Sequence, residues 1–269
     1  MRRSLGGLLL LAAGACFALA ASMFWMDRVA FSPSASTDNA YAILGDENIR
    51  EEVANLVASV DAPVIGVSAT ELADFIESIA RIRAGAREMR VFVADAHART
   101  IGERDEPVVI TAAEQVQIVR NENVALQPDI TLPVEEVGLI SAINTGARWV
   151  GLGSLAAFVL LAAAGLLMRS EQGEFTFAFA VGAAATAAGL IIFGFLVPAT
   201  VFPALSDDTW TGVFPRLARR MLPFTFVFAL LSIGVGALAY FGTSGLRQRR
   251  ARSTPLATSR YREPQRWTR

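Results

Sequence analysis

The chain of 269 residues contains a single histidine, a single cysteine and no lysine. Within one chain, these counts exclude a zinc site with several His or Cys ligands, a disulfide, and a Schiff-base or P-loop lysine. The histidine, His97, has Asp95 before it and Glu103 and Asp105 shortly after it. A hydrolase or metal site would use His97 as general base or ligand. We favour the simpler interpretation, a helix histidine whose ring bonds a backbone carbonyl or a carboxylate.

Acidic side chains crowd the segment that follows the first apolar run. A divalent cation site is conceivable there, but the spacing matches no EF-hand loop and favours a solvated acidic face. The sequence has no Gly-x-Ser-x-Gly elbow, no His-Glu-x-x-His motif and no glycine-rich phosphate loop. We therefore predict no catalytic residue, no metal site and no cofactor. The crowded residues are Asp27, Asp38, Asp46, Glu47, Glu51 and Glu52.

Long apolar runs place much of the chain in a membrane. Apolar residues make up 53% of the sequence and charged residues only 18%, whereas soluble domains carry about 25% charged residues. This excludes a soluble enzyme or a nucleic-acid-binding domain as a description of the whole chain. A membrane helix needs roughly 20 apolar residues. We predict an all-α protein with a four-helix transmembrane bundle, its spans covering residues 1–26, 149–168, 175–204 and 221–245, with Pro198 and Pro203 marking the exit of the third.

The predicted spans are free of titratable groups and rich in small residues. Ionisable residues inside a membrane mark ion paths and proton relays, so their absence argues against a proton-coupled transporter or an ion channel. Two pairs at i, i+4 spacing in the third span, Gly182/Thr186 and Ala185/Gly189, let helices approach closely. We predict that these four residues pack helices within the chain, with a partner helix as the alternative.

Residues 205–220, before the fourth span, form an amphipathic pattern. Trp210, Phe214 and Leu217 recur at i, i+4, i+7, and Arg216, Arg219 and Arg220 lie off that stripe. A basic amphipathic helix with aromatic residues on one side favours the bilayer interface. We predict a short interfacial helix on the outer leaflet, or one tucked under the neighbouring domain. The simplest alternative is an early start of the fourth span.

The distribution of arginine predicts the orientation in the plasma membrane. With both termini in the cytoplasm, eleven arginines lie on the cytoplasmic side and five near the outer surface, as the positive-inside rule requires. The first apolar run is too long for a typical signal peptide, so we interpret it as an uncleaved anchor. Lipidation of Cys16 in a degenerate lipobox is the less favoured alternative. The basic tail, residues 246–269, is expected to be disordered and attracted to the inner leaflet.

The one segment with the composition of a soluble domain is 27–148, with twenty acidic and ten basic residues. Its apolar residues recur at helical spacing, which predicts a small all-helical extracytoplasmic domain inserted between the first two spans. Asp46 is a candidate N-cap, and Ser68 and Thr111 open capping-box patterns. A further helix is predicted over 86–101, ending at Gly102, and 108–110 is a short extended piece. The domain is too small for a large core, so we expect it to lean on the membrane helices or a partner.

The order of these parts resembles a group of uncharacterised actinobacterial integral membrane proteins with four spans and a helical extracytoplasmic domain between the first and second. The likeness is carried by the segments 42–50, 92–99 (around Ala96 and His97) and 108–111. It implies the same architecture and supplies no catalytic residues.

The leading hypothesis is a non-enzymatic protein of the cell envelope, a scaffold or accessory subunit that presents an acidic domain outside. Its expected partners are membrane lipids and an envelope membrane protein or a second copy of the chain, and not nucleic acid. One alternative is a component of a transporter or channel, with Thr176, Thr186 and Thr200 lining an oligomeric pore. The other is an envelope hydrolase that uses His97.

Overall fold

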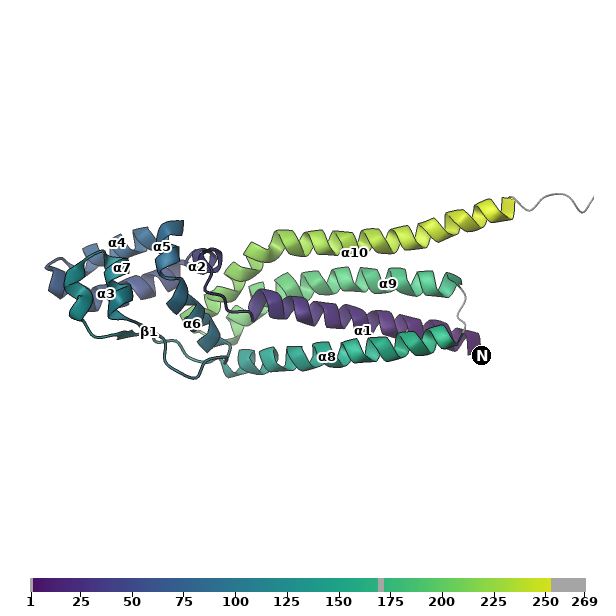
Figure 1. Ribbon diagram of the computed structural model, residues 1–269, viewed down its shortest axis with the longest axis horizontal. Helices are drawn as coiled ribbons and strands as arrows, with labels where there is room; N and C mark the ends of the chain where they lie inside the picture. The colour runs from purple at the N-terminus through teal and green to yellow at the C-terminus, as the bar shows by residue number, and fades with distance from the viewer. Residues whose placement is uncertain (1, 169–171, 253–269) are drawn as a thin grey trace, which may run out of the picture.

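The computed structural model describes residues 2–168 and 172–252, which fold into a row of long helices with a helical lobe at one end (Figure 1). Four helical segments are long and apolar enough to cross a membrane, which confirms the predicted number of spans. The predicted basic tail lies outside the described residues from 253 onward. The long helices are α1 (Arg2–Ala30), α8 (Gly138–Leu167), α9 (Gln172–Ile191), which the π-helix η2 (Ile192–Val201) continues, and α10 (Val213–Arg252).

The four long helices form an open row in the order α8, α1, α9, α10. Helix α1 packs against α8 on one side and α9 on the other, and α10 packs against α9. Within the described residues, α8 makes no extended contact with α9 or α10. The same order is visible from bottom to top in Figure 1. The expected bundle is therefore open along one side.

On the side of the lobe, two of the helices begin well before the predicted spans. Helix α8 starts at Gly138 and α10 at Val213, about ten residues ahead of the predicted starts at 149 and 221. Pro198, expected to end the third span, lies buried inside η2. A π-helical turn accommodates the hydrogen bond that proline lacks, so the helix continues past it.

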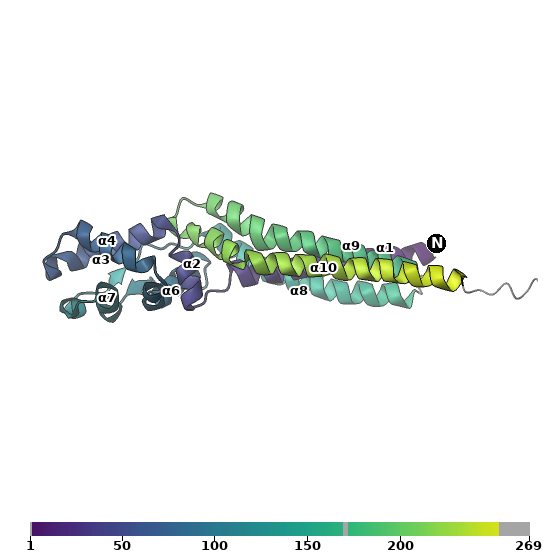
Figure 2. The same ribbon diagram turned by 90° about the horizontal axis from the view of Figure 1, so that it is seen from above.

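The segment between α1 and α8 forms the lobe, seen at the left of Figures 1 and 2. It is helical, as predicted, apart from two strands of two residues that pair antiparallel, Val109 with Thr131 and Ile110 with Ile130. Its elements are α2 (Thr37–Ile43), α3 (Glu47–Ile65), α4 (Ala69–Ala80), α5 (Arg83–Glu88), α6 (Arg90–Thr100), β1 (Val109–Ile110), α7 (Ala112–Val119), the 3-10 helix η1 (Glu122–Leu126) and β2 (Ile130–Thr131).

Several helix ends in the lobe follow the local signals in the sequence. The Ser68 hydroxyl accepts a hydrogen bond from the amide of Glu71, and Thr111 forms a complete capping box with Glu114. Gly102 has a φ of +74° and follows the last turn of α6. Two expectations were wrong. Asp46 makes no side-chain cap bond, and the helix predicted over 86–101 is two helices that meet at Met89.

The lobe core includes side chains from the segment before the fourth span. Trp210, Val213 and Leu217 are buried in the same cluster as the apolar faces of α3, α4 and α6. Trp210 belongs to the 3-10 helix η4 (Thr209–Gly212), which follows a further one, η3 (Phe202–Leu205). The lobe therefore leans on the membrane helices, as its small size led us to expect.

Candidate functional site

The junction between the lobe and the long helices brings together four aromatic side chains from distant parts of the sequence. Phe31 follows α1, His97 lies on α6, Phe202 begins η3 and Phe214 lies in the first turn of α10. All four are almost completely buried. The ring centroids of Phe202 and Phe214 are 5.1 Å apart, and those of Phe31 and Phe202 are 5.4 Å apart. We call this group the aromatic junction.

His97 has a structural position in the aromatic junction. Its Nε2 lies 2.8 Å from the carbonyl oxygen of Ala30, at the end of α1. A carbonyl oxygen only accepts, so Nε2 carries the hydrogen and donates it. The ring also meets Phe214 edge-on, at 5.9 Å between centroids. This is the carbonyl-bonded helix histidine that the sequence favoured, now with its partner identified.

Burial makes His97 a poor general base. With 1% of its surface exposed, the side chain offers a substrate no access. Burial also lowers the pKa of His97 to about 4, because the charged imidazolium loses its hydration. Of the acidic neighbours in sequence, Asp95 pairs with Arg104 at 3.2 Å. The local geometry therefore gives His97 the role of a link between α6 and α1.

The predicted interfacial stripe lies inside the protein, which corrects its placement on the outer leaflet. Trp210, Phe214 and Leu217 are at most 3% exposed, and the indole Nε1 of Trp210 donates to Glu52 Oε1 at 3.1 Å. A stripe of this kind is equally suited to a protein core and to lipid, and here the lobe covers it. The alternative of a helix tucked under the neighbouring domain describes the result.

The arginines beside that stripe bind the lobe as well. Arg216 lies 3.1 Å from Asp46, and Arg220 lies 3.6 Å from Asp38. Arg219 is exposed. On the other side of the junction, Arg148 of α8 pairs with Asp27 and Glu103. These pairs join both α8 and α10 to residues at the base of the lobe.

The acidic residues noted in the sequence thus serve in large part as arginine partners. Among the residues that the structure describes, no three of His, Cys, Asp and Glu are grouped so as to hold a metal ion. A different acidic cleft, of about 720 Å³, opens between α3, the segment before α8 and the loop before η4. Its carboxylates are Glu52, Glu135, Glu136, Asp207 and Asp208.

Small residues of the third span form a close seam with α1. A Cβ atom added at Gly182 would lie 3.1 Å from the Cα of Gly14, and one added at Gly189 would lie 2.1 Å from the Ser22 hydroxyl. Thr186 is buried on the same face. These residues pack helices within the chain, as predicted. Ala185 is exposed and lies off the seam, which corrects the prediction for that residue.

The threonines considered as pore-lining residues bond their own helix. Thr176 donates to the carbonyl of Gly173, Thr186 to that of Gly182 and Thr200 to that of Leu196. Bonds of this kind satisfy a hydroxyl inside a membrane without a partner helix or water. They give the pore hypothesis no support from this structure.

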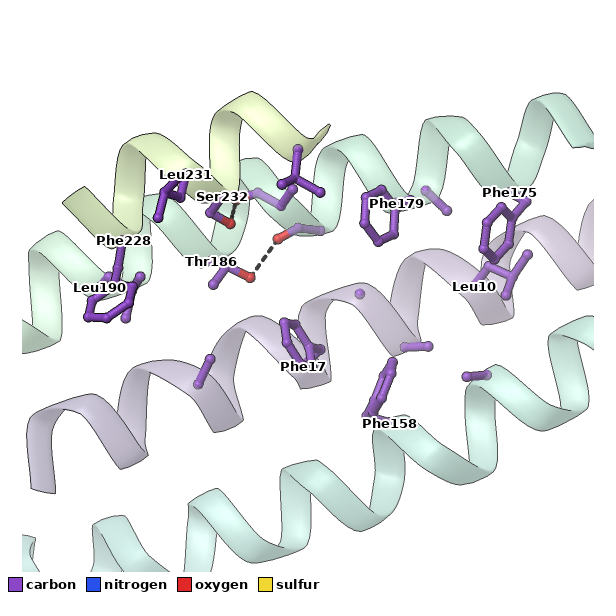
Figure 3. A pocket seen from close by; sticks show the side chains of 18 of the residues that line it. Leu10, Phe17, Phe158, Phe175, Phe179, Thr186, Leu190, Phe228, Leu231 and Ser232 are labelled. Atoms are coloured by element: carbon purple, nitrogen blue, oxygen red, sulfur yellow. Dashed lines mark hydrogen bonds between the residues drawn. The ribbon is translucent and has the colours of Figure 1, made fainter. Parts of the chain in front are cut away.

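On its open side, the row of helices carries an apolar cleft of about 790 Å³ (Figure 3). Helices α8 and α10 form its two walls, and α1 and α9 lie between them. Phe17 and Phe158 meet across it at 5.2 Å between ring centroids. We call it the lateral cleft. It is lined by Leu10, Ala13, Gly14, Phe17, Ala21, Trp25, Phe158, Ala162, Leu166, Phe175, Ala178, Phe179, Gly182, Ala183, Thr186, Leu190, Phe228, Leu231, Ser232 and Val235.

Sequence reasoning missed the lateral cleft and the acidic cleft, because each is formed by segments that are far apart in the chain. Comparison with family models, with curated proteins and with solved structures gave no match. The function is therefore argued from the geometry alone.

Proposed function

We propose that this multi-pass membrane protein is a non-enzymatic scaffold or accessory subunit of the cell envelope, which holds its acidic lobe in a fixed position outside the plasma membrane. The observation that carries this proposal is the aromatic junction. Phe31, Phe202 and Phe214 fill the joint between lobe and membrane helices with buried rings. A flexible tether would leave such a joint polar and exposed.

Helix α10 supports a fixed lobe in a second way. It runs without a break from Val213, in the lobe core, through the fourth span. The rise of a helix is about 1.5 Å per residue, so a displacement of the lobe displaces a rigid rod in the membrane. Ion pairs of Arg148 and Arg216 with lobe residues brace the same joint. A fixed lobe of this kind suits a protein that positions a partner at a set distance from the bilayer.

The charge of the lobe indicates the kind of surface a partner would present. Segment 27–148 has ten more acidic than basic residues. Complementary charge speeds association and selects partners. We therefore expect a partner with a basic surface, and an orientation with the lobe outside follows from the arginine distribution.

In-cell photocrosslinking tests the proposal. A photoreactive residue replaces Leu126, which is 95% exposed on the lobe, and in the matched control it replaces Leu160, which is 71% exposed on α8. We expect a discrete protein adduct from position 126 that position 160 does not give, and we expect its loss when Phe214→Ala loosens the junction. No adduct from a scan of exposed lobe positions would contradict a scaffold role. An adduct indifferent to Phe214→Ala would contradict the fixed lobe.

A further inference from the structure

The lateral cleft has the dimensions of a site for a hydrocarbon chain. It extends along α1 from Leu10 to Trp25, which is about 22 Å at the rise of an α-helix. A helix about 10 Å in diameter would occupy roughly 1,700 Å³ over that length, about twice the volume of the cleft, 790 Å³. An extended lipid chain is far thinner than a helix. The volume therefore favours a lipid chain as occupant over a transmembrane helix.

The lining offers the occupant no free polar group. Its two hydroxyls are already bonded to backbone carbonyls, Thr186 to Gly182 at 2.8 Å and Ser232 to Ala183 at 2.9 Å. Figure 3 shows both among phenylalanine and leucine side chains. A headgroup would lose its hydration there without compensation. Only the apolar part of a ligand suits the cleft.

The two ends of the cleft differ. Towards the lobe, the Trp25 indole donates to the Thr225 hydroxyl at 3.0 Å, and its ring meets Phe228 at 5.0 Å between centroids. This contact joins α1 to α10 across that end. Away from the lobe, the cleft reaches Leu166 in the last turn of α8 and Phe175 in the first turn of α9. A headgroup therefore belongs at the membrane surface far from the lobe.

The helix ends at that far surface are rich in arginine. In the sequence, α1 begins with Arg2 and Arg3, and the last turns of α10 contain Arg247, Arg249, Arg250 and Arg252. Clusters of arginine next to a membrane attract anionic lipids. From this charge, the volume and the closed end, we propose that the lateral cleft binds an acyl chain of an anionic phospholipid in the leaflet away from the lobe. This inference holds whichever side of the membrane the lobe occupies.

Photolabelling of the full-length protein in nanodiscs tests the proposal. The bilayer is phosphatidylcholine with a small fraction of phosphatidylglycerol that carries a diazirine in its acyl chain. We expect the label to concentrate on the segments of α8 and α10 that line the cleft. Ala162→Trp, which fills the cleft from α8, should reduce that labelling at least fivefold. The matched control Ala163→Trp, on the exposed neighbouring position outside the lining, should leave it unchanged.

A second pair keeps the test decisive if Ala162→Trp does not fold. Leu231→Trp fills the cleft from α10, whereas Leu230 is 66% exposed and outside the lining, so Leu230→Trp is its control. Equal labelling of cleft and outer faces, or equal effects of the two variants in a pair, would overturn the proposal. Equal labelling by a phosphatidylcholine probe would overturn the anionic headgroup. Crosslinks to a second copy of the chain across the cleft would show a helix as occupant and also overturn it.

Discussion

Phe214→Ala is the substitution that we expect to uncouple the lobe from the membrane helices. Phe214 is fully buried, and its ring lies 5.1 Å from Phe202, 5.9 Å from His97 and 6.4 Å from Phe31, between centroids. Removing a buried phenylalanine ring costs about 3–5 kcal/mol, from lost apolar burial and the cavity left behind. Every 1.4 kcal/mol is about tenfold in an equilibrium. The open state of the junction should therefore become at least about a hundredfold more populated.

Hydrogen–deuterium exchange of the purified protein in mild detergent measures this opening. Amides of α6 and of the last turn of α1 should exchange at least about a hundredfold faster in Phe214→Ala, because they flank the His97–Ala30 bond. The matched control is Phe224→Ala, on the same helix and 58% exposed, which should change exchange there only slightly. If Phe214→Ala left these amides unchanged, or if both variants acted alike, the aromatic junction would not hold the lobe.

Three further predictions concern stability, each measured by thermal unfolding in detergent. His97 has a folded pKa of about 4 against an ordinary 6.5, so the unfolded chain takes up a proton that the folded chain refuses; stability should fall from pH 6.5 towards 4 by up to about 3 kcal/mol, and His97→Gln, which keeps a donor for Ala30, should weaken that dependence. Asp61 is fully buried, with neither carboxylate oxygen bonded to a described residue, and burial raises its pKa to about 6. Its stabilising protonation is lost as pH rises through 6, so Asp61→Asn should stabilise the protein at pH 7.5, by up to about 3 kcal/mol, and have little effect below pH 4; a destabilised Asp61→Asn at pH 7.5 would refute this. Gly182→Val should destabilise by about 1–3 kcal/mol through overpacking against α1, whereas Ala185→Val on the exposed side should be near neutral; equal losses would contradict the seam.

The number and type of the membrane helices could be predicted because they depend on local composition. About 20 apolar residues without charge have few alternatives to a spanning helix. The helix starts on the lobe side could not be predicted in the same way. The segment from Val213 to Arg220 mixes apolar and basic residues, and its pattern is equally suited to lipid and to protein. Only the tertiary fold, which buries Trp210 and pairs Arg216 with Asp46, decides between them.

The candidate site was predictable only in its residue types. The sequence indicated that His97 lies at the edge of an apolar face and that small residues line the third span. It could not identify Ala30 as the partner of His97, because that contact joins residues 67 positions apart. Nor could it separate Gly182, which faces α1, from Ala185, which faces away. The lateral cleft depends on how four helices are placed relative to one another, for which local periodicity carries no signal.

Cysteine labelling in intact cells tests the central claim, a lobe displayed outside a four-span membrane anchor, most directly. In a Cys16→Ala background, Leu126→Cys places one thiol on the lobe and Ser253→Cys places one in the basic tail. A membrane-impermeant maleimide should label Leu126→Cys in intact cells, and Ser253→Cys only after lysis. Labelling of Ser253→Cys in intact cells, with Leu126→Cys protected until lysis, would contradict the account.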